Sequence, residues 1–583
     1  MTGAAALPDR WLTDWRRSPR MPFYTRANAG EVLPDPASPL GWTLVFEQGL
    51  IPGWLRGLVE FGIYRDGELD AGHPPVVGSF GGYFYINLSH CRVVAIRMGM
   101  TTEAFDAALL GNAAAAPPYH PHPDDPCEQC SAKVAQTIGE ILGASHFPQI
   151  EADLERVLAK RRDRPDLAAL SAAELVAHAR SFLPELDNAF ARHDYSTFGS
   201  AVGPAMLAEA CAAAGQPEAL LDLISGYGEV PSASPSWGLW QLSRLANASP
   251  ELGVLFDLGP AAVAAALDGA EPAVVKFAEA LDGFLADFGQ RGPNEWDIRA
   301  ISWEANPDQV LALVETMRHM PDEDSPDARH ARLEATRESA TERIRGALAD
   351  ESGRQSFDVA LQSSARTIPL REKTKLIAVT TINEVRMALR ELGRRGVAAG
   401  YYAYPEDVMM LLESELDDYV ADPARFAPVI AERLAQYLAL FEIEPPFIID
   451  AEPAPLPAWP RRARPRPDPA SAGEVLHGIG GSAGQYQGRA RVGMTLPAAM
   501  ALEPGEILVA PLTDAAWTPL FLVAGAVVVD VGALNSHAVV VSRELGIPCV
   551  LSLEDATARL RDGMELAVDG TAGTVTVISE GQP

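Results

Sequence analysis

The chain has 583 residues, with 78 acidic and 47 basic side chains and a formal net charge of −31 at pH 7. This length exceeds one ordinary hydrophobic core, so two or more domains are expected. The negative charge argues against nucleic acid and anionic membrane as partners, because both require a basic surface. No run approaches the ~20 apolar residues of a membrane helix, and the first residues lack a signal-peptide pattern. We therefore expect a cytoplasmic globular protein.

The N-terminal part of the chain predicts a loose lead-in followed by a large domain. Residues 1–20 form the lead-in, and residues 21–450 form a mainly α-helical domain with some β structure. Segment 23–40 is rich in turn formers and carries Glu31, which we expect to face a pocket or to be a solvated loop carboxylate. Residues Gly82–Ser89 alternate in polarity and predict a β-strand.

A proline-rich segment from Tyr119 to Cys130 contains four residues of the types that zinc accepts: His120, His122, Cys127 and Cys130. The alternative is a surface loop with reduced thiols. The two pairs are closely spaced and a proline separates the histidines, so we predict the surface loop and no metal site. The five cysteines do not indicate a disulfide framework.

Residues from about 152 to 450 show mainly helical periodicity. Segments 175–190 and 272–288 have apolar residues at three-and-four spacing, which is typical of helices packed on a core. After the second of these, Arg291 and Glu295 either line a site or form a structural pair at a helix end.

A further helix is predicted to begin near Leu370. Its apolar positions lie on one face and are Leu376, Val379, Ile382, Val385, Leu389 and Leu392. Arg371 and Lys375 are four residues apart, which places two cations on adjacent turns. Because like charges on adjacent turns destabilise a helix, the pair is better explained by an anion bound between the two cations. The alternative is a solvated basic turn.

Residues 451–472 are rich in proline and arginine and predict a semi-rigid linker to a C-terminal α/β domain at 473–583. In that domain, residues 525–530 predict a buried strand. The pattern after Gly532 is helical and ends at Gly546. His537 therefore lies at the start of a helix, where free N–H groups and the helix dipole favour an anion, usually phosphate.

A histidine at this place is suited to carry a phosphoryl group, because neutral imidazole is nucleophilic near pH 7. A surface or N-cap histidine is the alternative. The segment Gly525–Leu551 resembles the phosphohistidine swivelling domain of the phosphoenolpyruvate-synthase and pyruvate-phosphate-dikinase group. The matching residues are Gly532, Ser536, His537, Ala538, Arg543, Glu544, Gly546, Ile547, Pro548 and Val550.

The resemblance implies that His537 is the phosphorylated residue and that Gly532, Asn535 and Ser536 form the phosphate loop. Two positions depart from the family pattern, Ala533 (usually Gly) and Asn535 (usually Thr). Similar flanking motifs occur at 478–484, 488–492 and 512–520. The last of these resembles the rifampicin-phosphotransferase branch in particular.

Other segments are similar to the substrate domain of that branch. The resemblance implies that Glu31, Arg291 and Glu295 bind substrate, although Gln290 stands where the family has histidine. It also implies that the helix with Arg371 and Lys375 faces the histidine domain. The two cations would then hold the transferring phosphoryl group and the developing oxyanion.

The activity that the resemblance implies is an ATP-dependent phosphotransferase. Nothing in the sequence resembles an ATP-grasp domain or a phosphate-binding P-loop. The arrangement is similar to split enzymes such as phenylphosphate synthase and its cresol-phosphorylating relatives. We therefore expect a separate ATP-grasp subunit that binds ATP with Mg²⁺, transfers the β-phosphoryl group to His537 and releases AMP and phosphate.

The expected acceptor is a hydroxyl of a small phenol-type substrate. Three alternatives to this prediction stay open. The first is a kinase for an antibiotic or another natural product, and the second is a phosphohistidine carrier without its own acceptor. The third is a non-catalytic binding module in which Ala533 and Asn535 mark the loss of phosphorylation at His537.

Overall fold

The computed structural model describes residues 7–70, 72, 74–110, 116–228, 230–462, 467–514, 517–532, 536–553 and 555–581. Packing divides the chain into two compact units. Unit 1 contains residues 1–199, 294–300 and 373–465, and unit 2 contains residues 200–293, 301–372 and 466–583. The helical segments 200–293 and 301–372 thus belong with the C-terminal α/β region, whereas the linear pattern predicted one domain from 21 to 450.

Unit 1 is built on a four-stranded antiparallel sheet in the order β2-β3-β1-β4. These strands are β2 (Val77–Phe80), β3 (Tyr83–Asn87), β1 (Tyr24–Thr25) and β4 (Ile448–Ile449). Strand β3 confirms the prediction for residues 82–89. The helices that lie wholly in unit 1 are α1 (Ala29–Val32), a π-helix (Gly41–Leu50), α2 (Ile51–Phe61), α3 (Leu88–Arg97), α4 (Thr102–Leu110), α5 (Glu128–Gly143), α6 (Pro148–Arg162), α7 (Ala172–Arg180), α17 (Leu416–Ala421) and α18 (Pro423–Leu440).

Two segments that were expected to lie outside the domains, the loose lead-in and the semi-rigid linker, contribute buried residues to unit 1. Trp11, in the expected lead-in, is only 2% exposed. Leu456 and Trp459, in the expected linker, are also buried, and the Trp459 ring lies against Gly81. The Leu456 N–H donates to the carbonyl oxygen of Asp9 at 3.0 Å. Burial of these large apolar side chains holds both segments against unit 1.

Unit 2 combines helices with an eight-stranded mixed sheet in the order β5-β12-β11-β7-β8-β9-β10-β6. Its strands are β5 (Val475–His477), β6 (Ile479–Ser482), β7 (Gln485–Val492), β8 (Ile507–Ala510), β9 (Ala526–Val529), β10 (Cys549–Leu551), β11 (Glu565–Asp569) and β12 (Thr574–Ser579). Strands β7, β8, β9 and β10 run parallel, and the outer pairs are antiparallel.

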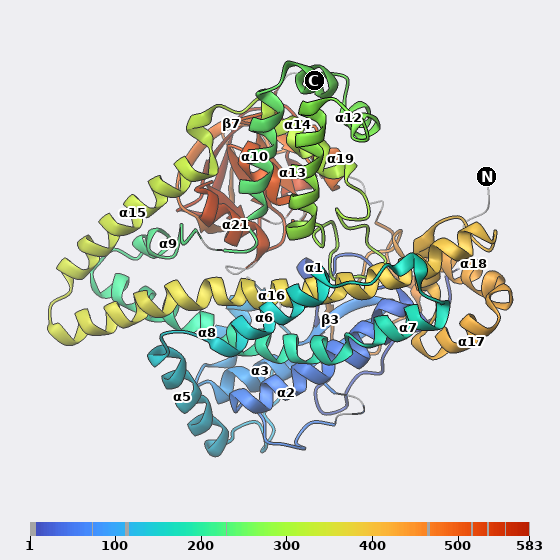
Figure 1. The fold of residues 1–583 in the computed structure, drawn as a ribbon. Helices are drawn as coiled ribbons and strands as arrows, with labels where there is room; N and C mark the ends of the chain where they lie inside the picture. The colour runs from blue at the N-terminus through green and yellow to red at the C-terminus, as the bar shows by residue number, and fades with distance from the viewer. Residues whose placement is uncertain are drawn as a thin grey trace. The chain divides into compact units, whose positions relative to one another are not determined.

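The helices that lie wholly in unit 2 are α9 (Ala219–Leu223), α10 (Pro235–Asn247), α11 (Pro250–Asp257), α12 (Pro260–Ala266), α13 (Pro272–Phe288), α14 (Asp308–Arg318), α15 (Pro326–Ala347), α19 (Leu496–Ala499), α20 (Thr518–Val523), α21 (His537–Leu545) and α22 (Ala556–Arg559) (Figure 1). Helix α13 confirms the helix predicted over residues 272–288. A mainly helical multidomain chain with a small C-terminal α/β region is therefore present, as the sequence predicted.

The two faces of the sheet in unit 2 belong to different cores. Leu508, Val527 and Val529 pack with α10, α13, α14, α20 and α21, while Ile507 and Val528 pack with the segment around α22 and with β11 and β12. Successive side chains of a strand point to opposite faces, and both faces of the parallel strands are covered. This explains the continuous apolar run that the sequence shows before His537.

Two long helices, α8 (Leu183–Ala213) and α16 (Glu351–Ala398), contribute residues to both units. The expected start of a helix near Leu370 was wrong, because α16 begins at Glu351 and contains Pro369 in its interior. Phe357 and Ala360, in the first turns of α16, pack into a core of unit 2, and this burial stabilises the part of the helix before Leu370. The predicted apolar face is confirmed for Val379, Ile382, Val385 and Leu389, all fully buried.

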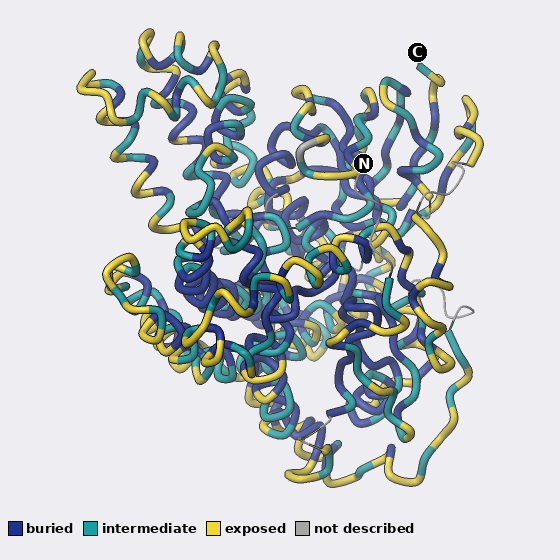
Figure 2. Tube along the Cα trace, turned by 90° about the vertical axis from the view of Figure 1, so that its right-hand side faces the viewer, coloured by how far each residue is buried: buried dark blue, intermediate teal, exposed yellow. Residues whose placement is uncertain are grey.

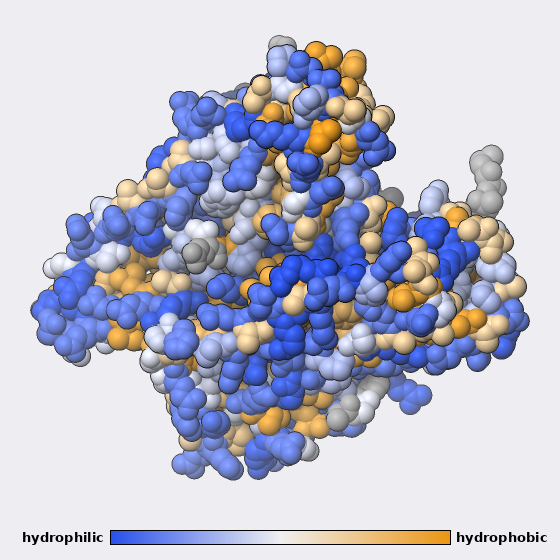
Figure 3. Space-filling model, viewed as in Figure 1, coloured by the Kyte–Doolittle hydropathy of each residue, from blue (hydrophilic) through white to orange (hydrophobic). Residues whose placement is uncertain are grey.

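Exposed and buried positions alternate along the outer helices (Figure 2). The visible face in Figure 3 is mostly hydrophilic, with small separate apolar patches, in keeping with the strong negative charge. Within the described part of the chain, no helix combines the length and apolar character needed to cross a membrane.

Candidate functional site

Helix α21 starts at His537, as the sequence predicted. The helix ends at Gly546, which adopts a left-handed conformation with φ 66°, and the N–H of Ile547 donates to the carbonyl oxygen of Ser542 at 2.9 Å. Glycine adopts this conformation without the steric penalty that a Cβ atom brings. The strand β9 and the short helix α21 thus place His537 at the carboxyl end of a buried parallel strand.

Two threonine hydroxyls hold the imidazole of His537. Nε2 lies 2.9 Å from Oγ1 of Thr518, and Nδ1 lies 3.2 Å from Oγ1 of Thr513. The Phe521 ring meets the imidazole edge-on, with 5.8 Å between centroids. The histidine is partly buried. Its ring orientation is therefore set by hydrogen bonds at both nitrogens and by an aromatic contact.

Sequence reasoning did not name Thr513 or Thr518 as site residues. Both lie in the segment 512–520, which had been noted only as a flanking motif. Their separation from His537 along the chain hides the contact, which arises because α20 and α21 pack together in the core of unit 2. The motif itself was the signal that would have indicated them.

The expected phosphate loop is described in part. Ser536 occupies the N-cap position of α21 in an extended conformation, and its side chain is 4% exposed. Its hydroxyl has no hydrogen-bond partner among the described residues. A Cβ atom at Gly532 would lie 3.3 Å from this hydroxyl and 3.1 Å from Leu551, so a glycine avoids crowding there. Asn535 and Ala533 lie outside the described residues.

A chain of polar contacts within unit 2 connects His537 to Arg371. Thr518 Oγ1 donates to the carbonyl oxygen of Ser232 at 3.4 Å, and the Ser232 hydroxyl donates to Glu372. Glu372 in turn pairs with the guanidinium of Arg371 at 2.8 Å. Glu372 is 4% exposed, so its charge is compensated inside the protein. This relay of contacts links one of the two predicted cations to His537 through three intervening residues.

Arg291 belongs to the same neighbourhood of unit 2. Its side chain is 1% exposed and donates to the carbonyl oxygen of Pro231 at 3.3 Å, next to Ser232. Arg291 therefore supports the backbone segment that reaches Thr518. Whether it also binds substrate stays a prediction.

The other predicted binding residues belong to unit 1. Lys375 forms an ion pair with Glu295 at 3.4 Å, and Glu295 is 2% exposed. Glu31 lies in α1 and is partly buried. Arg371 and Lys375 each have a carboxylate partner in the structure. Their proximity along α16 therefore does not by itself require an anion between them, and their roles stay predictions.

Helix α21 is also anchored through Glu544. This carboxylate is 2% exposed and accepts the N–H groups of Tyr227 at 3.2 Å and Gly228 at 2.8 Å. Burial raises the pKa of Glu544 above its ordinary value, and the two backbone donors oppose that shift. The neighbouring Arg543 donates to the carbonyl oxygen of Gly481 at 2.8 Å.

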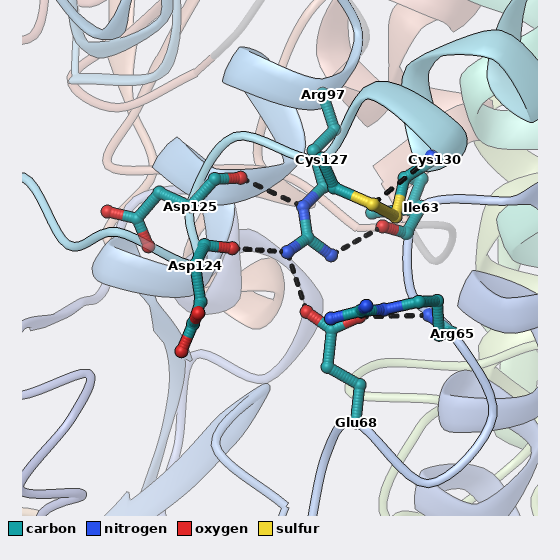
Figure 4. The surroundings of a disulfide bond; sticks show 8 residues. All are labelled: Ile63, Arg65, Glu68, Arg97, Asp124, Asp125, Cys127 and Cys130. Carbon is teal, nitrogen blue, oxygen red and sulfur yellow. Dashed lines mark hydrogen bonds and ion pairs between the residues drawn. A yellow bond between two sulfur atoms is a disulfide. The ribbon is translucent and has the colours of Figure 1, made fainter.

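The expectation of reduced thiols at Cys127 and Cys130 was wrong, because the two residues form a disulfide (Figure 4). The S–S bond engages both sulfurs that were considered as zinc ligands. No group of three or more candidate metal ligands occurs within the described ranges.

Comparison with known protein families supports the predicted resemblance. Residues 193–372 match the model of the rifampicin phosphotransferase fourth domain, and residues 502–573 match the mobile domain of PEP-utilising enzymes. The second match contains His537, Thr513 and Thr518. These two segments of the chain are thus similar to PEP-utilising, rifampicin phosphotransferase-like proteins. The first match contains Arg371 and Ser232, so both ends of the relay lie in family segments.

Several curated proteins are similar to a little over half of this chain. The chain is 30% identical over 310 residues to rifampicin phosphotransferase of Streptomyces sviceus, covering 52% of this chain and 34% of the relative. It is 33% identical over 305 residues to an uncharacterized protein of Mycobacterium tuberculosis, covering 52% and 32%. It is 29% identical over 350 residues to the prodigiosin synthesizing transferase PigC of Serratia marcescens, covering 58% and 38%. The chain spans about a third of the length of these relatives.

Proposed function

We propose that the chain is a phosphotransferase component that carries a phosphoryl group on His537. The observation that carries this proposal is the imidazole at the start of α21, held by Thr513 and Thr518 next to the buried hydroxyl of Ser536, which has no hydrogen-bond partner in the part of the chain that the structure describes. A structural histidine would not require an unsatisfied donor beside it, because a buried hydroxyl without a partner costs free energy. A phosphoryl oxygen would give that hydroxyl an acceptor.

The residues around His537 fit a phosphoryl group. The first N–H groups of α21 lack partners within the helix, and the positive end of its dipole favours negative charge. Ser536, Thr513 and Thr518 add hydroxyl donors. When His537 is phosphorylated, the new N–P bond occupies one ring nitrogen. The threonine that was hydrogen-bonded to that nitrogen must then bond to a phosphoryl oxygen instead.

The proposed overall reaction consumes ATP, water and an acceptor hydroxyl and yields AMP, phosphate and a phosphate ester. A separate ATP-grasp subunit binds ATP with Mg²⁺ and supplies the β-phosphoryl group, while water takes up the γ-phosphoryl group. The ring nitrogen of His537 forms the bond to phosphorus and later releases it to the acceptor oxygen. The acceptor proton leaves with that transfer.

We assign Arg371 and Lys375 to charge stabilisation during transfer to the acceptor, with Glu31, Arg291 and Glu295 as substrate-binding residues. Arg371 is supported by its contact with Glu372, which reaches Thr518 through Ser232. Cationic side chains stabilise the charge of a transferring phosphoryl group by electrostatics. A phenol, with a pKa of about 10, loses its proton more readily than an alkyl alcohol, which favours a small phenol as acceptor.

A second candidate is a kinase that acts on a larger natural product. The names of two relatives, a rifampicin phosphotransferase and a prodigiosin synthesizing transferase, favour it. The two candidates share the chemistry at His537 and differ only in the acceptor. A panel of phenols and of polyketide or polypyrrole antibiotics, assayed for acceptor-dependent AMP formation, separates them.

The carrier role itself is tested by incubating the chain and an ATP-grasp partner with ATP labelled on the β-phosphate. We expect acid-labile, alkali-stable label on the wild type and none on His537→Ala. His477→Ala is the matched control, because His477 is an exposed histidine on β5 of the same unit. This variant should still be labelled at His537. Label that persists on His537→Ala would remove His537 from the mechanism.

A further inference from the structure

Unit 1 contains a second chemically distinctive place, the Cys-Glu-Gln-Cys turn at the start of α5. Cys127 is the N-cap of this sixteen-residue helix, and the N–H of Cys130 points at the Cys127 sulfur at 3.2 Å. Cys127 is partly exposed, whereas Cys130 is 3% exposed. The disulfide therefore joins a partly exposed cysteine to a buried one, and Figure 4 shows the bond with the residues around it.

The position of Cys127 favours a thiolate when the bond is opened. A sulfur at a helix N-terminus receives backbone N–H donors and the positive end of the helix dipole, both of which stabilise negative charge. The thiolate is the nucleophile and the better leaving group in thiol–disulfide exchange. An accessible sulfur with these donors and a shielded second sulfur form the arrangement that reversible exchange requires.

The disulfide contributes little as a structural crosslink. It joins residues three apart, at the cap and first turn of one helix, so it closes a very small loop. The entropy that a disulfide removes from the unfolded chain grows with loop length, and a bond within one turn restrains the least. Stability of the fold is therefore a poor explanation for this pair.

Helix α3 holds the segment before the disulfide independently of the S–S bond. Arg97, with a side chain 1% exposed, donates to the carbonyl oxygens of Asp124 at 2.6 Å and Asp125 at 2.9 Å. The same guanidinium donates to Ile63 at 2.8 Å and pairs with Glu68 at 2.6 Å (Figure 4). The backbone on which Cys127 is mounted should thus stay in place when the bond opens, which makes the opening reversible.

The three other cysteines lack these features. Burial raises the pKa of Cys91 to about 12, that of Cys211 to about 11 and that of Cys549 to about 12. A thiol that stays protonated at neutral pH is a poor nucleophile. These residues serve as internal controls in the same molecule.

We propose that Cys127 and Cys130 form a redox-active pair that exchanges reversibly with an external dithiol. The first thiolate of the dithiol attacks the sulfur of the partly exposed Cys127, forming a mixed disulfide, and Cys130 leaves as a thiolate and takes a proton. The second thiol of the dithiol then attacks the first sulfur of the dithiol, which is bonded to Cys127 in the mixed disulfide, and Cys127 is released as a thiolate. The dithiol is oxidised to its disulfide, and the chain gains two thiols. This site is independent of the chemistry at His537.

The test uses the full chain in buffers that span ratios of reduced to oxidised dithiothreitol, with folding verified by circular dichroism. Thiols are trapped first without denaturant and then, with a second reagent, after unfolding, and both labels are located by mass spectrometry. We expect the first label at Cys127 to appear and disappear reversibly with the ratio, together with the second label at the buried Cys130, while Cys91, Cys211 and Cys549 lack the first label at every ratio. In the single variants, Cys127 of Cys130→Ser should be alkylated at least about tenfold faster at pH 7 than Cys130 of Cys127→Ser.

Three results would overturn the proposal. The pair stays oxidised at every ratio until the protein is unfolded, or it stays reduced under oxidising conditions, or the purified protein contains one equivalent of zinc that blocks alkylation of both thiols. Equal alkylation rates in the two single variants would refute the assigned difference between the sulfurs, even if the bond is reversible.

Discussion

The hydroxyl oxygen of Thr518 lies 2.9 Å from Nε2 of His537, and the same oxygen lies 3.4 Å from the carbonyl oxygen of Ser232. One side chain on α20 thus contacts both the histidine of the family's mobile domain and the helical segment of unit 2. The orientation of the imidazole therefore depends on this threonine as well as on the helix that bears the histidine.

Replacing Thr518 with valine keeps the shape of the side chain and removes its hydroxyl. We expect the rate of phosphorylation of His537 to fall roughly fivefold, because one hydrogen bond contributes about 1 kcal/mol to the orientation of the ring. The measurement is the initial rate of label incorporation from ATP with the partner subunit present. Thr576→Val, at a partly exposed position on β12, is the control and should charge at the wild-type rate.

Arg371→Ala is expected to spare phosphorylation of His537 and to slow transfer to the acceptor at least about a hundredfold, because the lost cation stabilises the transferring group. Label on the histidine and acceptor-dependent AMP formation are measured separately. Arg345→Ala removes an exposed arginine that pairs with Asp358 on the outside of unit 2, and it should change neither rate. Loss of histidine labelling in Arg371→Ala would contradict the assigned division of roles.

Glu544→Ala should lower the free energy of unfolding by about 1–3 kcal/mol, because two partly buried N–H groups lose their acceptor. Glu544→Gln retains an amide oxygen that can accept one of them, so its loss should be smaller. Urea unfolding at neutral pH measures both variants against the wild type. An alanine variant as stable as the wild type would show that Tyr227 and Gly228 do not depend on this carboxylate.

Asp14 predicts a pH dependence of the stability of unit 1. The carboxylate accepts the N–H groups of Trp11 at 3.0 Å and Gly82 at 3.1 Å, and burial raises its pKa from 3.8 to about 6. Since the pKa in the folded state is the higher one, its stabilising contribution is complete below 3.8 and is lost as the pH rises through about 6. The free energy of unfolding should therefore fall over this window.

The comparison for this prediction is Asp14→Asn, which does not titrate and should show a flatter pH profile than the wild type. Asp66→Asn, at an exposed position of the same unit, should follow the wild type. Identical slopes for the wild type and Asp14→Asn between about pH 4 and pH 6 would contradict the assignment of the dependence to this carboxylate.

Local pattern in the sequence was enough to predict β3, β9, α13 and α21 and to single out His537. Each of these elements has a periodicity, or a stop residue such as Gly546, within a short window, and short-range sterics decide it. The family motif around His537 is likewise local. Its glycine and serine positions reflect crowding near Gly532 and Ser536, which neighbouring residues create.

Tertiary structure alone decided which distant residues meet. Thr513 and Thr518 reach the imidazole, and Glu372 reaches Thr518 through Ser232, because α10, α20 and α21 share one core with the sheet of unit 2. The same holds for the burial of Trp11 and Trp459, for the early start of α16 and for the carboxylate partners of Arg371 and Lys375. Packing free energy is shared among residues far apart in the chain, so no window of sequence contains it.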